Sequence, residues 1–233
     1  MRAFCFVNSL FFLISMSGKI VAQENSTNSE RRWGIVAQAS PNFCNKVLTP
    51  DQLSIYEESL NQKVNPKMGY HISIGAIYEF NPHFQLQADL RFSSLGVRTI
   101  SEPCTNPEIG TSSMCQSYYN FNYIDMPISV NYILGTNKLR YVFSAYFSGG
   151  LLVRYTLVDH VEPPTGDRYK KIEAESKKTE WSPFAGVRIG VTYQLNNNWS
   201  LLALPEYRIG LHPDFYSSHL MSFGLNVGII RRL

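Results

Sequence analysis

Alternation of apolar and polar residues is the dominant pattern of this chain, and its longest examples flank Asn81-Pro82-His83. Before this tripeptide, one set of alternate residues is apolar: Met68, Tyr70, Ile72, Ile74, Ala76, Tyr78 and Phe80. After it, the apolar alternates are Phe84, Leu86, Ala88, Leu90 and Phe92. Side chains of a β-strand point to opposite faces with a period of two, so the pattern predicts two long, half-buried strands in an antiparallel hairpin.

The same alternation recurs in six further segments, which brings the number of predicted strands to eight. These segments lie at about 32–40, 118–134, 138–158, 181–195, 199–209 and 221–229. The connections between strands alternate in length. Three are short and turn-rich (81–83, 135–137 and 196–198), three are long (about 41–66, 100–117 and 159–179), and the last, near 211–217, is intermediate. We therefore predict an all-β fold, an eight-stranded antiparallel up-and-down transmembrane β-barrel with short periplasmic turns and long outer loops.

The N-terminal segment reads as an export signal. A basic residue at Arg2, an apolar run from Phe4 to Met16 and small residues near Ala22 follow the order of a secretory signal peptide. We expect residues 1–22 to be removed and residues 23–233 to form one outer-membrane barrel domain with both termini in the periplasm. No later segment approaches the ~20 apolar residues of a spanning helix, so the sequence excludes helical membrane spans.

Composition and lysine placement favour a barrel in a membrane. The net charge of +3 includes two cations of the signal, Arg2 and Lys19, so nothing indicates a nucleic-acid partner. A soluble lipocalin-like ligand carrier would also alternate, but with lysines in mid-strand on its wet face. Here every lysine after the signal lies in a predicted loop or at a strand end: Lys46, Lys63, Lys67, Lys138, Lys170, Lys171, Lys177 and Lys178. Aromatic residues near the short turns predict a periplasmic girdle of Tyr78, Phe80, Phe84, Tyr132, Tyr141, Tyr193 and Trp199.

Ionisable residues of the polar face fall at a common height, about six to ten residues from the nearest short turn. They are His71, Asp89, Arg91, Asp125, Arg188, Glu206 and Arg208. An eight-stranded barrel has no wide aqueous bore, and buried ions persist only when they are paired. We predict a network of salt bridges that fills the lumen, rather than a general diffusion pore, a proton path or a gate. A change of apolar phase in strand 118–134 predicts a β-bulge near Tyr123 to Asp125 that turns Asp125 inward.

Three cysteines remain after the signal, all in predicted loops. In an oxidising compartment Cys104 and Cys115 could form a disulfide, which would leave Cys44 unpaired. No His spacing supports a zinc site, so we expect no metal and no cofactor.

The outer loops and one histidine are the remaining candidates for function. Segment 51–64 could form a short amphipathic helix, and the charged segment 168–178 could bind a partner protein or lipopolysaccharide phosphates, or simply be solvated. His219, with Ser217, Ser218 and Asp214, could in principle form the site of an acyl hydrolase that acts on outer-membrane lipids. Sequence neighbours are not spatial partners, however, so we predict a protein that is not an enzyme.

One hairpin resembles a known family. Tyr123-Ile124-Asp125-Met126-Pro127-Ile128, followed by Tyr132 and a Gly149-Gly150 strand, resembles the Pro-containing hairpin of the PorT-like family of outer-membrane β-barrel proteins. The strands around 186–190 and 224–228 are similar to the later glycine-bearing strands of that family. The resemblance implies an eight-stranded outer-membrane barrel and, for the family's namesake, a part in protein secretion. The leading hypothesis is a monomeric barrel surrounded by outer-membrane lipids that engages other envelope or secretion proteins through its loops or rim.

Overall fold

The fold is described from a computed structural model of the chain. It describes residues 33–48, 64–99, 101–105, 112–135, 137–162, 169–176, 180–212 and 218–233. Throughout β7, and at the outer ends of some other strands, only the backbone is described. The predicted signal peptide and residues 51–63 of the predicted helix at 51–64 lie outside the described residues. Within these residues no helix is both long and apolar enough to cross a membrane.

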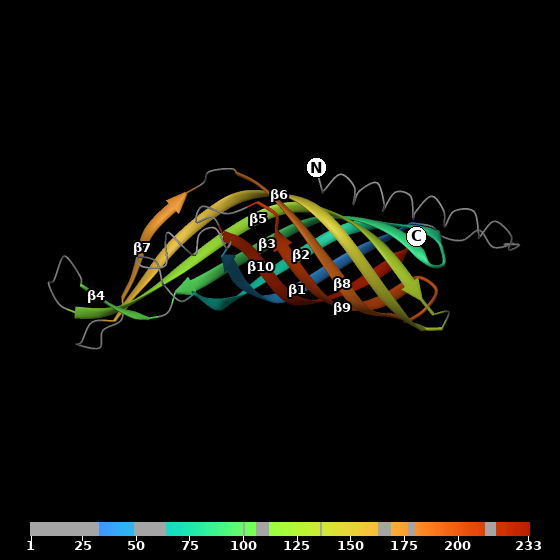
Figure 1. Cartoon of the computed structure of the whole chain (residues 1–233). Coiled ribbons are helices and arrows are strands. Elements are labelled where there is room, and N and C mark those ends of the chain that lie inside the picture. The colour runs from blue at the N-terminus through green and yellow to red at the C-terminus, as the bar shows by residue number, and fades with distance from the viewer. Residues whose placement is uncertain are drawn as a thin grey trace, which may run out of the picture. The chain divides into compact units, whose positions relative to one another are not determined.

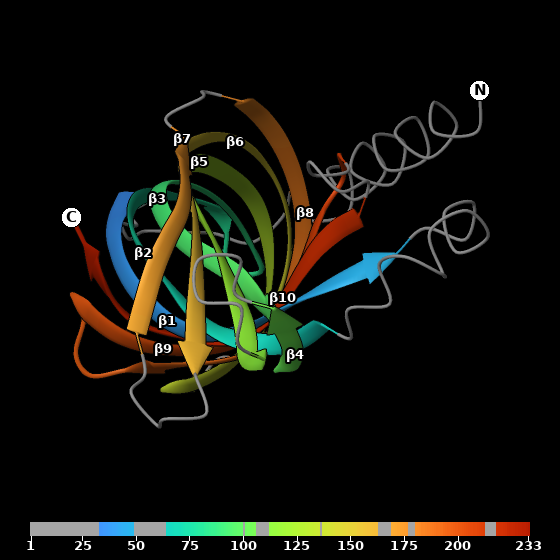
Figure 2. The ribbon, with the colours of Figure 1, turned by 90° about the vertical axis from the view of Figure 1, so that its left-hand side faces the viewer.

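Eight of the ten strands that the structure describes form a closed antiparallel ring (Figures 1 and 2). The ring strands are β1 (Trp33–Leu48), β2 (Val64–Asn81), β3 (Phe84–Thr99), β5 (Ser112–Leu134), β6 (Leu139–Glu162), β8 (Glu180–Gln194), β9 (Trp199–Gly210) and β10 (Ser218–Arg232). Each pairs with its neighbour in this order, and β1 pairs with β10 to close the barrel, for example at Ala37 and Ile229. Closure leaves no free edge in the ring. The predicted eight-stranded up-and-down barrel is confirmed.

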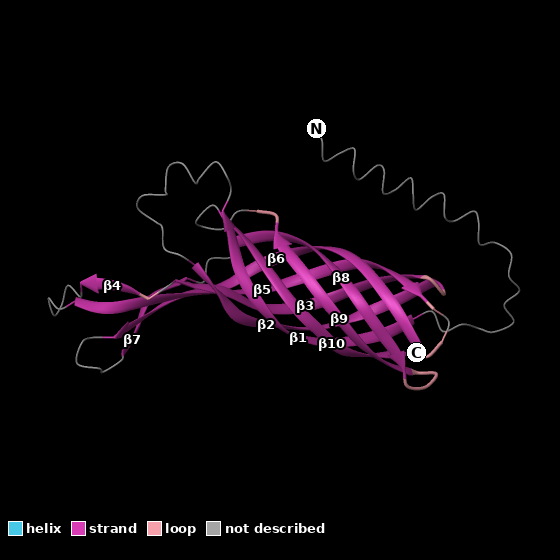
Figure 3. Cartoon of the chain, turned by 60° about the horizontal axis from the view of Figure 1, so that its bottom comes forward, coloured by secondary structure: helices cyan, strands magenta, loops and turns pink. Residues whose placement is uncertain are grey.

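The other two strands flank an extension of the barrel (Figure 3). Strand β4 (Glu102–Thr105) pairs with the start of β5, and β7 (Tyr169–Ser176) pairs with the end of β6. Much of 100–117 and 159–179 is therefore strand, and the prediction that these segments are loops is wrong. The segments lack the apolar alternation of the barrel wall because they continue beyond it. Likewise, β1 continues to Leu48 inside the predicted first loop.

The two faces of the ring have opposite chemistry. Ile72 and Val187 are 53% and 48% exposed on the outside, whereas Asp89 and Arg188 are each 2% exposed on the inside. The exposed large hydrophobics include residues of every ring strand. A wide apolar outer surface suits contact with hydrocarbon and not with water.

The predicted bulge in β5 is wrong, although Asp125 does point inward. The pairing of β5 with β3 runs without a shift from Phe84–Tyr132 to Arg98–Tyr118. The extra residue lies in β6 instead, where Asn122 pairs with Arg154 and Tyr123 with Leu152, leaving Val153 between them. Phe121 and Tyr123 are buried in the same phase as Asp125. The strand therefore keeps one phase throughout. Its inward residues change from aromatic, at Phe121 and Tyr123, to ionic, at Asp125.

Side chains fix the short turns at the opposite end of the barrel. The Asn81 side-chain oxygen accepts hydrogen bonds from the backbone N–H groups of His83 and Phe84, each at 2.9 Å. Asn196 accepts from Asn198 at 2.9 Å and from the N–H of Trp199 at 3.0 Å. Asn favours such turns because its side chain mimics a backbone acceptor. The girdle aromatics pack beside these turns, with Tyr78 against Phe80 at 5.1 Å and Phe84 against Tyr132 at 5.0 Å between ring centroids.

We expect Ile74→Arg to lower the free energy of unfolding from lipid vesicles by about 2–4 kcal/mol, because it places a cation at mid-strand on the lipid face. Leu134→Arg, beside a short turn, should cost less than about 1 kcal/mol, because its guanidinium reaches the interface. Urea titration in vesicles measures both values. A barrel with water outside would tolerate the two changes equally.

Candidate functional site: the barrel lumen

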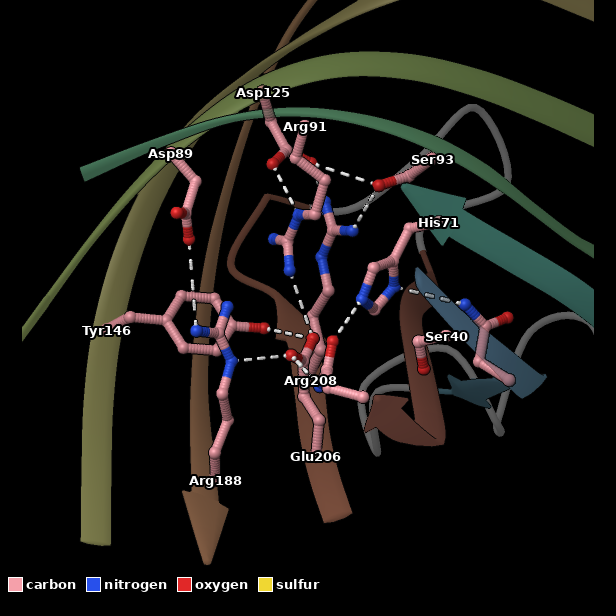
Figure 4. A network of polar contacts seen from close by, with 12 residues as sticks. Ser40, His71, Asp89, Arg91, Ser93, Asp125, Tyr146, Arg188, Glu206 and Arg208 are labelled. Carbon is pink, nitrogen blue, oxygen red and sulfur yellow. Dashed lines mark hydrogen bonds and ion pairs between the residues drawn. The ribbon is translucent and has the colours of Figure 1, made fainter. Parts of the chain in front are cut away.

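All eight ring strands send a polar side chain into one connected lumen network (Figure 4). The network contains Asn42 of β1, His71 of β2, Asp89, Arg91 and Ser93 of β3, Asp125 of β5, Tyr146 of β6, Arg188 of β8, Glu206 and Arg208 of β9, and Asn226 of β10. Each ionisable member of this set is at most 5% exposed. The structure therefore brings together all seven ionisable residues singled out in the sequence.

Glu206 is the residue with most partners in this network. Its Oε1 accepts from Arg91 Nη1 at 3.0 Å and from the Tyr146 hydroxyl at 2.7 Å. Its Oε2 accepts from Arg188 Nε at 2.7 Å and from Asn226 Nδ2 at 2.8 Å. Four donors from four strands thus converge on one carboxylate, so a single side chain ties β3, β6, β8 and β10 to β9.

Asp125 is the second anionic centre. Its Oδ1 accepts from Arg91 Nε at 2.7 Å, and its Oδ2 accepts from Arg208 Nη2 at 2.6 Å. Ser93 bridges the same two groups, because its hydroxyl accepts from Arg208 Nη1 at 2.9 Å and donates to Asp125 Oδ2 at 3.3 Å. Arg91 spans Asp125 and Glu206 and so joins the two centres.

Asp89 is held more loosely. Its nearest cation is Arg188, with Nη1 at 4.0 Å from Oδ2. The Gln87 amide donates to both of its oxygens at 2.8 and 2.9 Å, and Asn131 donates to the Gln87 oxygen at 3.2 Å. The neutral Gln87 amide thereby supplies the two side-chain hydrogen bonds that this carboxylate receives.

The hydrogen bonds of His71 define a neutral imidazole. Asn226 uses its Nδ2 to donate to Glu206 and to the Leu204 carbonyl, so its Oδ1, 2.6 Å from His71 Nε2, must accept. Asn42 accepts on its Oδ1 from the Cys44 thiol, which leaves its Nδ2 to face His71 Nδ1 at 3.5 Å. His71 therefore donates from Nε2 and accepts at Nδ1.

With His71 neutral, the charges of the network balance. Three guanidiniums, Arg91, Arg188 and Arg208, meet three carboxylates, Asp89, Asp125 and Glu206. Aromatic rings lie over the cations. The centroid of the Tyr146 ring is 5.1 Å from Arg91 Cζ and 4.6 Å from Arg188 Cζ, and the centroid of the Phe184 ring is 3.7 Å from Arg208 Cζ. Balanced charge with ion pairs is the condition under which ions persist in a low-dielectric interior. The hydrogen bonding is not complete, because Arg91 Nη2, Arg188 Nη1 and Arg208 Nε have no hydrogen-bond partner among the described residues.

Two apolar layers enclose the ionic layer along the barrel axis. On the side of the sheet extension lie Cys44, Leu95, Val97, Phe121, Tyr123, Leu152, Phe184 and Leu220. On the side of the short turns lie Val36, Ile77, Ile133, Val142, Leu202, Leu204 and Ile230. Buried apolar side chains thus lie in the described lumen on both sides of the ionic layer. This arrangement suits a rigid structural core better than a water-filled pore.

Two inward-facing glycines make room for the network. A Cβ at Gly75 would lie 2.0 Å from Asp89 Oδ1, and a Cβ at Gly186 would lie 2.4 Å from Tyr146 Cζ. Such contacts are far inside van der Waals distance, so any larger residue would displace the Asp89 carboxylate or the Tyr146 ring. Close approach, not backbone freedom, explains glycine at these positions.

Sequence reasoning missed the uncharged members of the network. Tyr146 lies on the polar face of its strand, between outward-facing Ala145 and Phe147, and that mismatch was the available signal. Asn42 was missed because the first strand was predicted to end at Ser40, whereas β1 continues to Leu48.

The candidate hydrolase residues do not form a described site. His219 Nδ1 donates to the Gly210 carbonyl at 2.8 Å, which fixes its ring against the backbone of β9. The side chains of Asp214, Ser217 and Ser218 lie outside the described residues. Among the described residues there is no group of three or more His, Cys, Asp or Glu side chains that could hold a metal ion.

The cysteines differ in state. Cys44 is a free, buried thiol, and Cys115 is disulfide-bonded. The Cys104 side chain lies outside the described residues. Its backbone in β4 pairs with Ser113, two residues before Cys115 on β5, and Cys115 itself pairs with Glu102. The pairing of Cys104 with Cys115 stays a prediction.

We expect Glu206→Gln to lower the free energy of unfolding by about 3–5 kcal/mol, because it leaves Arg91 and Arg188 buried with one carboxylate fewer. Glu79→Gln is the matched control, since Glu79 pairs with Arg232 at 3.2 Å in a partly exposed position and should cost less than about 1 kcal/mol. Urea unfolding in vesicles compares the two. Equal losses would mean that the lumen network does not stabilise the barrel.

Alkylation of the unfolded chain without residues 1–22, the predicted signal peptide, tests the disulfide. Without reductant only Cys44 should react, giving one adduct by mass spectrometry, and after reduction Cys104 and Cys115 should add two more. Cys44→Ser should give no adduct before reduction. Alkylation of Cys104 without reductant would contradict the predicted pair.

Comparison with solved structures found several similar barrels. The neisserial surface protein A is similar in structure, with 16% identity, a TM-score of 0.44, and 86% of this chain and 97% of that chain covered. Ail of Yersinia pestis is 9% identical, with a TM-score of 0.38 and coverage of 85% and 97%. The N-terminal β-barrel domain of Pseudomonas aeruginosa OprF is 14% identical, with a TM-score of 0.34 and coverage of 84% and 96%.

No curated protein matches the chain in sequence. A family model does, over residues 21–216, and its description is outer membrane protein beta-barrel domain. Most of the ring, from β1 to β9, lies inside the matched range. The chain therefore belongs to the family of outer membrane protein β-barrel domains.

Proposed function

We propose that this protein is a non-enzymatic integral barrel of the outer membrane that binds other envelope components through its outer sheet extension. We define the outer sheet extension as β4, β7 and the paired outer parts of β5 and β6, residues 112–120 and 154–162. The proposal includes two further points: the signal peptide at residues 1–22 exports the chain, and the barrel is a monomer.

The length of the β5–β6 hairpin is the observation that carries the proposal. Strand β6 pairs with β8 as far as Leu152 and then continues to Glu162, still paired with β5 up to Met114. At ~3.3 Å per residue this continuation reaches about 30 Å past the last pair with β8. Strands β4 and β7 widen it to four strands. An ordered sheet of this length offers a surface for recognition, which a short loop would not.

The lumen supports a role outside the barrel rather than inside it. Its charges balance, and apolar layers enclose them on both sides. Lumen charges that are paired with each other are not available to a substrate or a permeating ion. These observations favour a scaffold over a channel.

The β5–β6 hairpin, which contains Tyr123–Ile128, resembles PorT-like proteins, and this resemblance suggests the class of partner. We infer that the partners are envelope proteins, and among them components of a secretion apparatus. The hairpin that carries the resemblance is the one that continues into the outer sheet extension, so the same element would anchor the barrel and present the binding surface.

Photocrosslinking in cells tests the proposal. A photoreactive residue at Met114, 40% exposed in the outer sheet extension, should give a discrete adduct that contains an envelope protein, identified by mass spectrometry. The matched control is Phe147, 54% exposed on the lipid face of the same hairpin, which should give lipid adducts only.

Two outcomes would contradict the proposal. In one, Met114 yields no protein adduct at native expression levels. In the other, both positions capture the same proteins, which would indicate contact through the membrane face instead of the extension.

A further inference from the structure

We propose that the outward face of β2, β3 and β5, at the base of the outer sheet extension, binds the phosphate groups of an outer-leaflet glycolipid. The site, which we call the rim cation site, consists of Lys67, Arg98 and Asn120. It rests on the outer-membrane location of the barrel and not on the protein partners proposed above.

Lys67 is held across the outer face of β3. Its Nζ contacts the side-chain oxygen of Asn120, a residue of β5 that pairs with Gly96. A Cβ at Gly96 would lie 3.2 Å from Lys67 Nζ and 3.4 Å from its Cδ, so the lysine stem crosses the strand where a side chain is missing. The ammonium is thereby positioned on the outer wall of the barrel.

Arg98 provides the second cation. It is exposed between buried Val97 and Thr99, which places it on the outward face. It lies two residues beyond Gly96 on the same strand face, or about 7 Å along β3. The nearest outward positions of β3 and β5 are Ser94, Tyr118 and Asn122, and none is a carboxylate. Two cations with neutral hydrogen-bonding neighbours therefore lie side by side.

The surface beneath the rim cation site is apolar. Going from the site toward the short turns, the outward residues become Phe92 and Leu90 on β3, and Ile124 and Met126 on β5. Leu90 is 54% and Met126 62% exposed. A ligand that matches both zones has a phosphate at one end and acyl chains at the other. Charge complementarity and continuity with the lipid-facing wall thus select a phosphorylated lipid over a free anion.

Native mass spectrometry of the detergent-solubilised barrel with diphosphorylated lipid A as the probe tests the site. Each cation near a lipid surface contributes about a fivefold change in affinity, so Lys67→Gln with Arg98→Gln should weaken binding about thirtyfold, and each single change about fivefold. Lys138→Gln, which removes a cation at the opposite rim, should leave binding unchanged. The heat-modifiable gel shift verifies that all variants are folded.

Two further probes separate the sources of phosphate. Dephosphorylated lipid A should bind the wild type as weakly as diphosphorylated lipid A binds the double variant, and inorganic phosphate should not compete. The inference is overturned if the double variant retains wild-type affinity, if dephosphorylated lipid A binds equally well, or if inorganic phosphate competes, since the last result would indicate a small-anion site. Loss of lipid binding with Met114 adducts intact would leave the proposed protein-binding function standing.

Discussion

The pairing of buried charge inside the barrel is the constraint on which the rest of this structure depends. A closed sheet with hydrocarbon outside must turn its polar alternates inward, and in an eight-stranded ring those side chains have little water to solvate them. The chain meets this constraint with three guanidiniums, three carboxylates and a neutral imidazole. Because every ring strand contributes a partner, the network also fixes which strands are neighbours. Glu206 alone receives donors from four strands, so its contacts form only when the ring is closed.

The apolar layers on either side of the ions make this network stronger than its hydrogen bonds alone. Phe121, Tyr123 and Phe184 on one side, and Ile77 and Ile133 on the other, keep bulk water from the charges. A lower local dielectric strengthens each ion pair and raises the penalty for an unpaired one. The same exclusion requires close packing, which is why Gly75 and Gly186 stand where Asp89 and Tyr146 need room. Charge pairing, close packing and closure of the ring therefore depend on one another.

Sequence alone could predict the ring, its two faces and the ionisable lumen residues, because all three follow from a period of two and from strand length. It could not predict that Tyr146 and Asn226 complete the Glu206 site, since a lone polar residue on an inward face carries no sign of its partner. The wrongly predicted bulge in β5 has a related cause. Phe121 and Tyr123 look like lipid-facing residues by chemistry, yet they share the inward phase of Asp125, and only the register with β3 resolves this. Strands β4 and β7 were missed because their residues, Glu102–Thr105 and Tyr169–Ser176, do not show the long apolar alternation of the ring strands.

A filled lumen changes where function can reside on such a molecule. Once the lumen ions are committed to one another, chemistry is left to the lipid-facing wall, the two rims and whatever projects beyond them. Lys67 illustrates the consequence, since its ammonium is carried across Gly96 to the outer wall rather than into the ionic layer, where a fourth cation would upset the balance. The β5–β6 hairpin illustrates it as well, because one continuous pair of strands runs from the ion network at Asp125 to Met114 outside the ring. The paired strands thus connect the lumen network directly to the outer sheet extension.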